Sequence, residues 1–300
     1  MNRPLVIGTR GSALALAQVD IFKKALRAQS LTIPVEIRKI VTAGDRQPEI
    51  KLVRESAAGV KGLFTKEIEQ LLLQGVIDVA VHSLKDLPGQ TPSALAVTAV
   101  LERADTSDVL LAKYASDIHA LPPGAAVATS SVRRARQLLW IRPDLRVQEI
   151  RGNVPTRVEK LRAGNSWDAI VLARAGLDRL RLELSDFQVS SLPILPAVGQ
   201  GAIALQSRRD SVEVNGLLAR INHLPTFLCI RAERELLRLL DGDCNLPVGV
   251  RTTIAGERLE MEAILFGKEG GAPIRALFAG SVHEPEDAAR ALYEQLDRRH

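Results

Sequence analysis

The sequence predicts an α/β protein built from two similar α/β domains joined by a crossover, followed by a small C-terminal α+β domain. Short apolar, β-branched runs alternate with helix-length amphipathic stretches from the start of the chain, a pattern typical of parallel sheets covered by helices. With 300 residues, of which 46% are hydrophobic and 25% charged, the chain is long enough to fill two or three domain cores.

The expected elements follow one another in two series. Strands are expected at 4–9, 35–41, 77–82, 125–129, 146–150 and 168–173, and helices at 12–28, 64–74, 131–140 and 154–163. In each series an apolar strand, Leu5–Thr9 or Ala125–Thr129, runs into hydroxyl residues that open a helix. The later strands correspond as well, since Asp78–Val81 resembles Asp168–Val171. We therefore expect two versions of one structural plan.

The remainder of the chain predicts a return crossover and a tail domain. The proline-rich passage 192–202 ends the second series and is expected to cross back to the first domain. Helical periodicity returns at 226–240, strand alternation follows at 250–266, and a last helix is expected at 285–298. The predicted domains are 1–101 plus 197–219, 102–196, and 220–300.

Composition excludes several classes of protein. The sequence has no run of eighteen apolar residues and no apolar signal-peptide core near its start, so we expect a cytoplasmic protein without a membrane span. Two cysteines are too few for a disulfide framework, and no Cys/His spacing suggests zinc, so no metal site is expected. Aromatic residues make up only 3%, which disfavours the stacking surfaces of single-stranded nucleic-acid binders.

The two cysteines lie in different contexts. Cys229 falls within an amphipathic helical run and is interpreted as a packed core thiol. Cys244 lies in a turn with Gly242 and Asp243 ahead of Pro247, which suits a reactive residue better. The carboxylate of Asp243 would raise rather than lower a thiol pKa, so a simple turn cysteine is an equal alternative at this point.

Arginines cluster although the net charge is only +5. Segment 131–157 contains Arg133, Arg134, Arg136, Arg142, Arg146, Arg151 and Arg157, against Asp144 and Glu149. Polar residues also follow the predicted strands: Arg10, Ser12, Thr129, Ser130, Ser131, Arg151 and Arg157. In open α/β sheets, ligands bind at such strand ends, where helix N-termini favour anions. The arginine fork suits carboxylates, so we favour an anion-binding cleft over scattered surface charge.

Lys85 and Asp86 follow the predicted buried strand 77–82. This position favours a carboxylate that works beside cations, although an ordinary loop ion pair is the alternative for a lone Lys-Asp dipeptide. Adjacent strand residues point to opposite faces, so His82 and Ser83 are poor members of a catalytic triad. We interpret His82 as a core or supporting histidine.

Seven motifs taken together carry a family resemblance. They are Gly8–Leu16, Lys61–Phe64, Val81–Asp86, Thr129–Arg134, Arg151–Val154, Leu195–Gly201 and the turn at Cys244. In this order, over nearly the whole chain, they closely resemble the hydroxymethylbilane synthases, also called porphobilinogen deaminases. The resemblance implies three domains, the first two like the lobes of periplasmic binding proteins.

The resemblance also implies a chemistry. Four porphobilinogen molecules would be deaminated and coupled head to tail on a dipyrromethane cofactor, then released as hydroxymethylbilane. Asp86 would be the catalytic carboxylate, and Lys61 and Phe64 would belong to an active-site loop. The residues implied for the cofactor are Cys244, as a thioether, with Lys85, Asp86, Thr129, Ser131, Arg133 and Arg134; those implied for substrate are Arg10, Ser12, Arg151 and Arg157. Each pyrrole brings an acetate and a propionate, which accounts for the arginines.

Two departures from the family pattern, Asp243 before the cysteine and Val60 in place of a glycine, bear on cofactor attachment and on the loop. The main alternative function is a non-catalytic, two-lobed carboxylate-binding protein. Nucleic-acid binding through the arginines is a third hypothesis, for which no helix-turn-helix context is present. The family suggests a monomer with porphobilinogen as its only partner.

Overall fold

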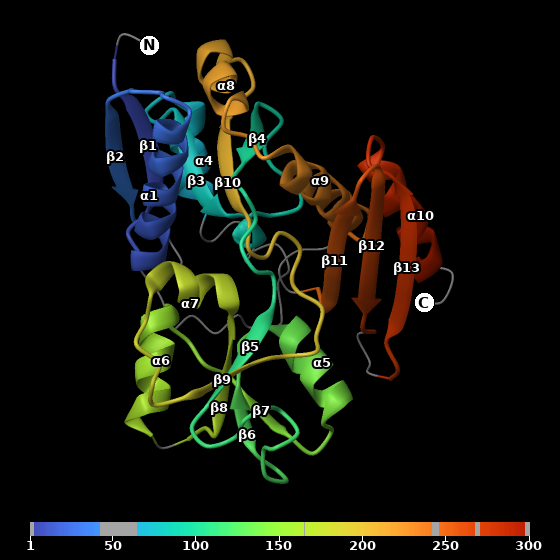
Figure 1. The fold of residues 1–300 in the computed structure, drawn as a ribbon. Coiled ribbons are helices and arrows are strands. Elements are labelled where there is room, and N and C mark those ends of the chain that lie inside the picture. Colours follow the sequence, from blue (N-terminus) through green and yellow to red (C-terminus); the bar gives the residue numbers. More distant parts are fainter. Residues whose placement is uncertain (1–2, 43–64, 165, 242–245, 268–270, 298–300) are drawn as a thin grey trace. The chain divides into compact units, whose positions relative to one another are not determined.

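The computed structural model describes residues 3–42, 65–164, 166–241, 246–267 and 271–297 (Figure 1). The chain forms two compact units. One consists of Met1–Ala104 with Ala202–Phe227, and the other of Asp105–Gly201 with Leu228–His300. The chain therefore passes from the first unit to the second and back before it enters the C-terminal elements.

The first unit contains a five-stranded sheet in the order β2-β1-β3-β10-β4. Its strands are β1 (Leu5–Arg10), β2 (Val35–Ile40), β3 (Val79–Ser83), β4 (Leu95–Val100) and β10 (Ile203–Arg208). β1 is parallel to β2 and β3, whereas β10 is antiparallel to β3 and β4. The carboxyl ends of the three parallel strands consequently meet at one edge of the sheet.

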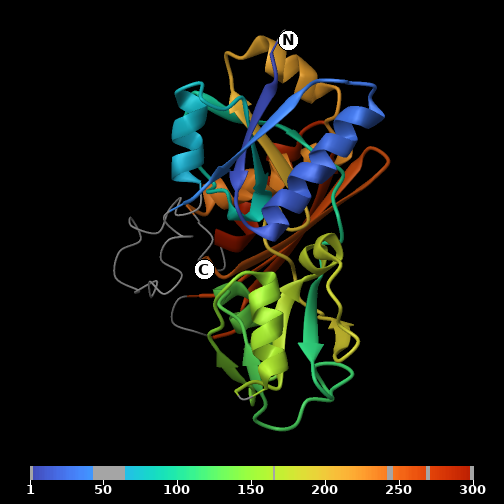
Figure 2. The ribbon, with the colours of Figure 1, turned by 90° about the vertical axis from the view of Figure 1, so that its left-hand side faces the viewer.

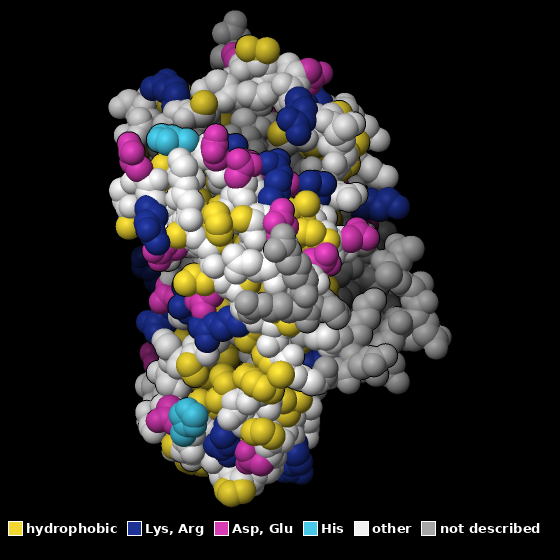
Figure 3. Space-filling model, turned by 90° about the vertical axis from the view of Figure 1, so that its right-hand side faces the viewer, with side chains coloured by type: hydrophobic (Ala, Val, Ile, Leu, Met, Phe, Trp, Pro, Cys, Tyr) yellow, Lys and Arg dark blue, Asp and Glu magenta, His cyan; other side chains and the backbone are white. Residues whose placement is uncertain are grey.

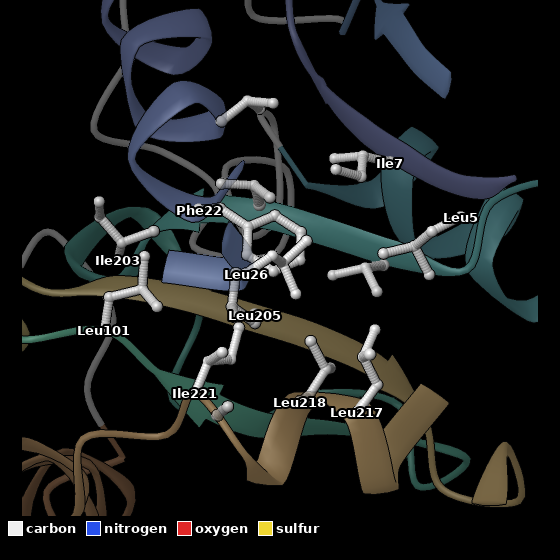
Figure 4. Close-up of a cluster of buried hydrophobic side chains, with 14 of the residues drawn as sticks. Leu5, Ile7, Phe22, Leu26, Leu101, Ile203, Leu205, Leu217, Leu218 and Ile221 are labelled. Atoms are coloured by element: carbon white, nitrogen blue, oxygen red, sulfur yellow. The ribbon is translucent and has the colours of Figure 1, made fainter. Parts of the chain in front are cut away.

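Helices cover both faces of this sheet. α1 (Ala13–Ala28), which lies across the strands in Figure 2, and α8 (Val212–Ala219) pack on one face, and α4 (Lys66–Leu73) packs on the other. Successive strand residues point to opposite faces, so Val81 belongs to one cluster with Phe22 and Leu218, which Figure 4 labels, while Ala80 packs with Ile68 in another. Burial of each large apolar side chain contributes about 1.5–3 kcal/mol.

The second unit contains a sheet of the same plan, in the order β7-β6-β8-β5-β9. Its strands are β5 (Asp108–Ala112), β6 (Ala126–Ala128), β7 (Arg146–Gln148), β8 (Ala169–Ala173) and β9 (Gln188–Ser191). β6 is parallel to β7 and β8, and β5 is antiparallel to β8 and β9. α5 (Val132–Ile141) packs on one face, and α6 (Val154–Ala163) and α7 (Arg174–Leu180) pack on the other.

Both sheets use a carboxylate to brace their first parallel strand. Asp78 accepts a hydrogen bond from the N–H of Val6 at 2.9 Å, and Asp168 accepts one from the N–H of Ala126 at 2.7 Å. The backbone N–H groups of the same two aspartates donate back to the carbonyls of Val6 and Ala126, at 2.8 and 2.9 Å. The predicted correspondence between the two series is thus confirmed in topology and in this hydrogen-bond pair.

The C-terminal part of the second unit is an antiparallel sheet with two helices. β11 (Val248–Ala255), β12 (Arg258–Leu265) and β13 (Ile274–Ser281) pair in that order. Side chains such as Leu236 of α9 (Leu224–Leu239) and Leu292 of α10 (Pro285–Asp297) share a core cluster with Met261 of β12. This is the small α+β part that the sequence predicts.

The predicted fold class is confirmed, and so is the return crossover, because β10 follows 192–202 and joins the first sheet. The prediction lacked β4, β5, β9, β10, β13, α7 and α8. β5 is a short apolar run buried along its whole length, so it has no alternation to reveal it. The three predicted domain boundaries remain a prediction.

Candidate functional site

At the carboxyl edge of the first sheet, β1 ends on Arg10 and Ser12 caps α1. The Oγ of Ser12 accepts a hydrogen bond from the N–H of Ala15 at 3.3 Å, and the first turn of α1 contains no acidic residue. The positive end of the helix dipole is therefore not neutralised by its own first turn, which favours an anion there. Between them, Gly11 is open, since a Cβ at this position would meet nothing within 4 Å.

β3 ends at the same edge and runs into a 3-10 turn, η1 (Leu84–Asp86). Leu84 and Leu87 are 1% and 4% exposed and anchor this turn. The N–H of Leu84 donates to the carbonyl of Ala202 at 3.1 Å, and that of Leu87 donates to Leu84 at 3.0 Å. Between these anchors Lys85 is half-buried and Asp86 is exposed. The turn thus holds the backbone in place and leaves the Asp86 carboxylate accessible at the edge where Arg10 ends β1.

His82 lies behind this turn as a buried neutral side chain. It is 6% exposed, and its Nε2 lies 3.1 Å from Oε1 of Gln206. Burial lowers the pKa of His82 to about 4, and the hydrogen bond to Gln206 only partly offsets this. The Oγ of Ser83 accepts a hydrogen bond from Nε2 of Gln18 at 2.7 Å. The prediction of a core histidine is therefore confirmed.

The carboxyl edge of the second sheet has a similar construction. Thr129, 5% exposed, accepts a hydrogen bond from the N–H of Ser131 at 3.2 Å. Ser131 caps α5 by accepting from the N–H of Arg134 at 3.4 Å, and Ser130 donates its hydroxyl to the carbonyl of Ile150. The first turn of α5 has no acidic residue. This helix N-terminus therefore also favours an anion.

Arg133 and Arg134, in the first turn of α5, are 5% and 6% exposed and share the fully buried Asp108. Arg134 donates Nε and Nη2 to Oδ1 of Asp108 at 3.0 and 2.7 Å, and Nη1 to the carbonyl of Val171 at 3.0 Å. Nη1 of Arg133 lies 2.8 Å from Oδ2 of Asp108 and also donates to the carbonyl of Leu195. Sequence reasoning missed Asp108 because β5 lies outside the arginine-rich segment.

This cluster carries one carboxylate for two guanidinium groups. Burial by itself would raise the pKa of Asp108, but the charges of Arg134 and Arg133 outweigh it and hold that pKa well below its usual range. Burial lowers the pKa of Arg133, and Asp108 partly offsets this. Within the described part of the chain, the buried Nε of Arg133 has no hydrogen-bond acceptor. The cluster is therefore suited to accept a further carboxylate.

Arg151 and Arg157 flank the start of α6. Arg151 donates Nε to Oε1 of Glu149 at 2.8 Å, and Arg157 donates Nε to the carbonyl of Gly152 at 2.8 Å. Asn153 caps α6 by accepting from the N–H of Thr156 at 2.9 Å. Gly152 has a φ of 113°, a conformation that other residues rarely adopt. The turn at Gly152 places both arginines at the edge where β6 and β7 end.

The structure thus groups the predicted residues in two sets. Arg10, Ser12, Lys85 and Asp86 lie at the edge of the first sheet, and Thr129, Ser131, Arg133, Arg134, Arg151 and Arg157 lie at the edge of the second. On the face in Figure 3, Lys and Arg side chains are scattered among Asp and Glu, in contrast to the buried arginine pair. Lys61, Phe64 and Cys244, with Val60 and Asp243, lie outside the described residues.

None of the helices in the described residues has the length and apolar character needed to span a bilayer. The same residues contain no group of three or more His, Cys, Asp or Glu side chains placed to hold a metal ion.

Comparison with known proteins gives full-length matches. A family model described as porphobilinogen deaminase, dipyromethane cofactor binding domain, matches residues 5–216, and one described as porphobilinogen deaminase, C-terminal domain, matches 227–297. The porphobilinogen deaminase of Desulforudis audaxviator is 44% identical over 299 residues, covering 99% of this chain and 95% of the relative. That of Rubrobacter xylanophilus is 43% identical over 292 residues, covering 97% and 93%.

Proposed function

Because the chain belongs to the porphobilinogen deaminase family, we propose roles for its residues in that family's reaction. The protein is a transferase of tetrapyrrole biosynthesis, a hydroxymethylbilane synthase. It joins four porphobilinogen molecules head to tail on a dipyrromethane primer and releases hydroxymethylbilane and ammonia. The proposal concerns which side chains hold the primer, bind the substrate and move the protons.

The residues at the edge of the second sheet fit a dipyrromethane cofactor. Together with Asp108, the buried arginine pair carries one net positive charge, and among the described residues Nε of Arg133 has no hydrogen-bond acceptor. Cofactor acetate and propionate groups would supply the missing carboxylates, with Thr129, Ser131 and the α5 N-terminus as further donors. When bound, the cofactor supplies a pyrrole terminus to which new rings add. We therefore assign Arg133 and Arg134 to cofactor binding.

Cys244 is the proposed attachment point of the cofactor. It belongs to the motif shared with the family and lies outside the described residues. The other cysteine, Cys229, is 7% exposed within α9, so a covalent group on its sulfur would have to be accommodated among packed side chains. A thioether persists through repeated cycles, so Cys244 needs to react only once.

Asp86 is the proposed catalytic carboxylate, and one observation carries this assignment. It is the exposed carboxylate that a buried, hydrogen-bonded turn delivers to the sheet edge beside Arg10 and Lys85. Loss of ammonia from an aminomethyl group leaves a cation, which a nearby carboxylate stabilises. The same carboxylate accepts hydrogen bonds from pyrrole N–H groups and takes up the proton lost from the ring.

The remaining arginines are proposed to bind substrate carboxylates. Arg10 and Ser12 would act at the first sheet edge, and Arg151 and Arg157 at the second. Lys85 would assist with the cofactor, and Lys61 and Phe64 would form part of an active-site loop. We also expect a cytoplasmic protein that is a monomer, and light scattering of the purified protein would test the monomeric state.

The intact mass of the purified protein tests this function. In a host that makes porphobilinogen, we expect an added mass of two linked pyrroles on the wild type and on the matched control Cys229→Ser, and none on Cys244→Ser. Wild-type protein of unmodified mass would contradict the proposal. An adduct that remains in Cys244→Ser but is absent from Cys229→Ser would show that the cofactor is attached to Cys229 in α9.

A further inference from the structure

Asp108 is the meeting point of three segments of the second unit. It begins β5, it binds both arginines of α5, and its Oδ1 accepts a hydrogen bond from Nε2 of Gln200 at 2.9 Å. Gln200 also donates to the carbonyl of Thr106 at 2.7 Å, so the segment that leaves the unit is bound both to the chain entering β5 and to this carboxylate. Because the Asp108 carboxylate is fully buried and held by several donors, its position and orientation are fixed.

The arrangement of Arg133 and Arg134 needs an external cause. Adjacent residues on a helix do not face each other, because each step turns the side-chain direction by about 100°. Here two consecutive side chains nevertheless converge, one on each oxygen of the same carboxylate. Each guanidinium also donates to a backbone carbonyl, of Leu195 or Val171, which restricts its rotation.

We propose that Asp108 is a positioning residue that draws Arg133 and Arg134 together into a pre-formed cationic site for a cofactor carboxylate. The inference rests on the proposed role of these arginines in holding the dipyrromethane. Asp108 does not touch the cofactor in this scheme; it acts through the two guanidinium groups. The contacts with Asp108 order the two guanidinium groups before the ligand arrives. Because Asp108 carries only one negative charge, one positive charge remains, and the site still attracts an anion.

A simpler role for Asp108 would be charge neutralisation that serves folding alone. Side-chain NMR of the full-length Cys244→Ser protein shows whether the two guanidinium groups are ordered without any cofactor, and the variants described next separate a positioning role from charge neutralisation alone. We expect the Nε–H proton of Arg134, assigned through Arg134→Lys, to exchange with water at least 100-fold more slowly than that of the exposed Arg258. Equally fast exchange in Cys244→Ser, with protection only in the cofactor-loaded wild type, would overturn the proposal.

Three variants provide the second test. Asp108→Asn removes the charge, Asp108→Glu keeps it but displaces the carboxylate by one methylene, and Asp144→Asn is the control, removing an exposed partner of Arg142 in the same unit. We expect the fraction of chains with the two-pyrrole adduct to fall at least tenfold in both Asp108 variants and not in Asp144→Asn. Folded Asp108→Glu with full occupancy and a wild-type KM would refute a positioning role.

The two tests fail in distinguishable ways. If neither Asp108 variant folds, the exchange measurement on Cys244→Ser decides, because that protein retains Asp108. If wild-type protein carries no adduct, the proposed function fails, whereas the exchange measurement still reports whether Asp108 orders the arginines. Thermal unfolding midpoints of all variants show whether a loss of occupancy exceeds a loss of folded protein.

Discussion

The Nε2 of His82 lies 3.1 Å from Oε1 of Gln206, and Nε2 of Gln206 donates to Glu69 at 2.8 Å. This buried chain of polar groups links β3, β10 and α4 directly behind the turn that carries Asp86. With its pKa lowered to about 4, the imidazole is neutral near neutral pH. Gln206 presents its Oε1 to the ring, and an amide oxygen only accepts, so this contact favours the tautomer with the proton on Nε2. The pair is therefore a neutral, buried hydrogen-bonded contact next to the turn.

Stability should depend on the neutral state of His82. Its pKa is about 4 in the folded protein and 6.5 when unfolded, so between these values the unfolded chain binds a proton that the folded chain does not. The free energy of unfolding should therefore rise with pH across this interval, by about 3 kcal/mol at the limit. Urea denaturation between pH 4.5 and 7.5 measures the slope.

Matched histidine variants identify the group responsible. His82→Gln should flatten the slope, whereas His283→Gln, a change at an exposed position, should leave it intact. The buried carboxylates with lowered pKa values, Asp78 and Asp108, lose their contribution only as the pH falls below about 4, outside this interval. Identical slopes in wild type and His82→Gln would contradict the prediction.

Asp86→Asn should separate chemistry from folding. The side chain is exposed, so the unfolding midpoint should change little, and the mass of the cofactor adduct should remain. Ammonia release from porphobilinogen should fall about 10²–10⁴-fold, the usual effect of removing a general acid–base group. Asp86→Glu should retain more activity than Asp86→Asn, and normal turnover in Asp86→Asn would remove Asp86 from the catalytic role.

Arg151→Ala should weaken the binding of substrate carboxylates rather than the fold. Its ion pair with Glu149 is partly exposed, so its loss should change the free energy of unfolding by less than about 1 kcal/mol. KM for porphobilinogen should rise at least tenfold, which steady-state kinetics would measure. Arg162→Ala, which removes ion pairs with Glu159 and Asp186, is the control, and an equal rise in KM there would make the effect nonspecific.

Periodicity predicts the helices, whereas the predicted strands β3, β6 and β8 are short apolar runs that are buried along almost their whole length. α6 spans the predicted 154–163, because Asn153 caps it and Gly164, in a left-handed conformation, ends it. The missed strands β5 and β10 are almost wholly buried, as the predicted β3 and β8 also are, and their partners lie far away in the sequence. Local pattern alone does not reveal such pairings.

The candidate site likewise contains residues that the sequence predicts and one residue, Asp108, that it does not. Strand-end position sufficed to select Arg10, Ser12 and Ser131 as edge residues, since each follows a recognisable apolar run. Asp108 was not predicted because its contacts with α5 are tertiary: Arg134 is 26 residues away in the sequence. Long-range ion pairs of this kind leave no spacing signal in one sequence.

The two bracing aspartates should differ in their effect on stability. Asp78 is 3% exposed and accepts hydrogen bonds from Val6 and, through both oxygens, from Arg3 at 2.7 Å. Asp168 makes the equivalent bond to Ala126 but is exposed, so water can replace it. Asp78→Ala should therefore cost about 1–3 kcal/mol and Asp168→Ala less than about 1 kcal/mol.

Chemical denaturation of both variants, beside Asp178→Ala as an exposed control that pairs with Arg174, would measure the difference. The partner Arg3 is largely exposed, so most of the cost should come from the unsatisfied N–H of Val6 and not from the lost ion pair. Arg3→Ala should accordingly cost less than Asp78→Ala. Equal decreases in the free energy of unfolding in Asp78→Ala and Asp168→Ala would mean that burial does not determine how much these hydrogen bonds stabilise the fold.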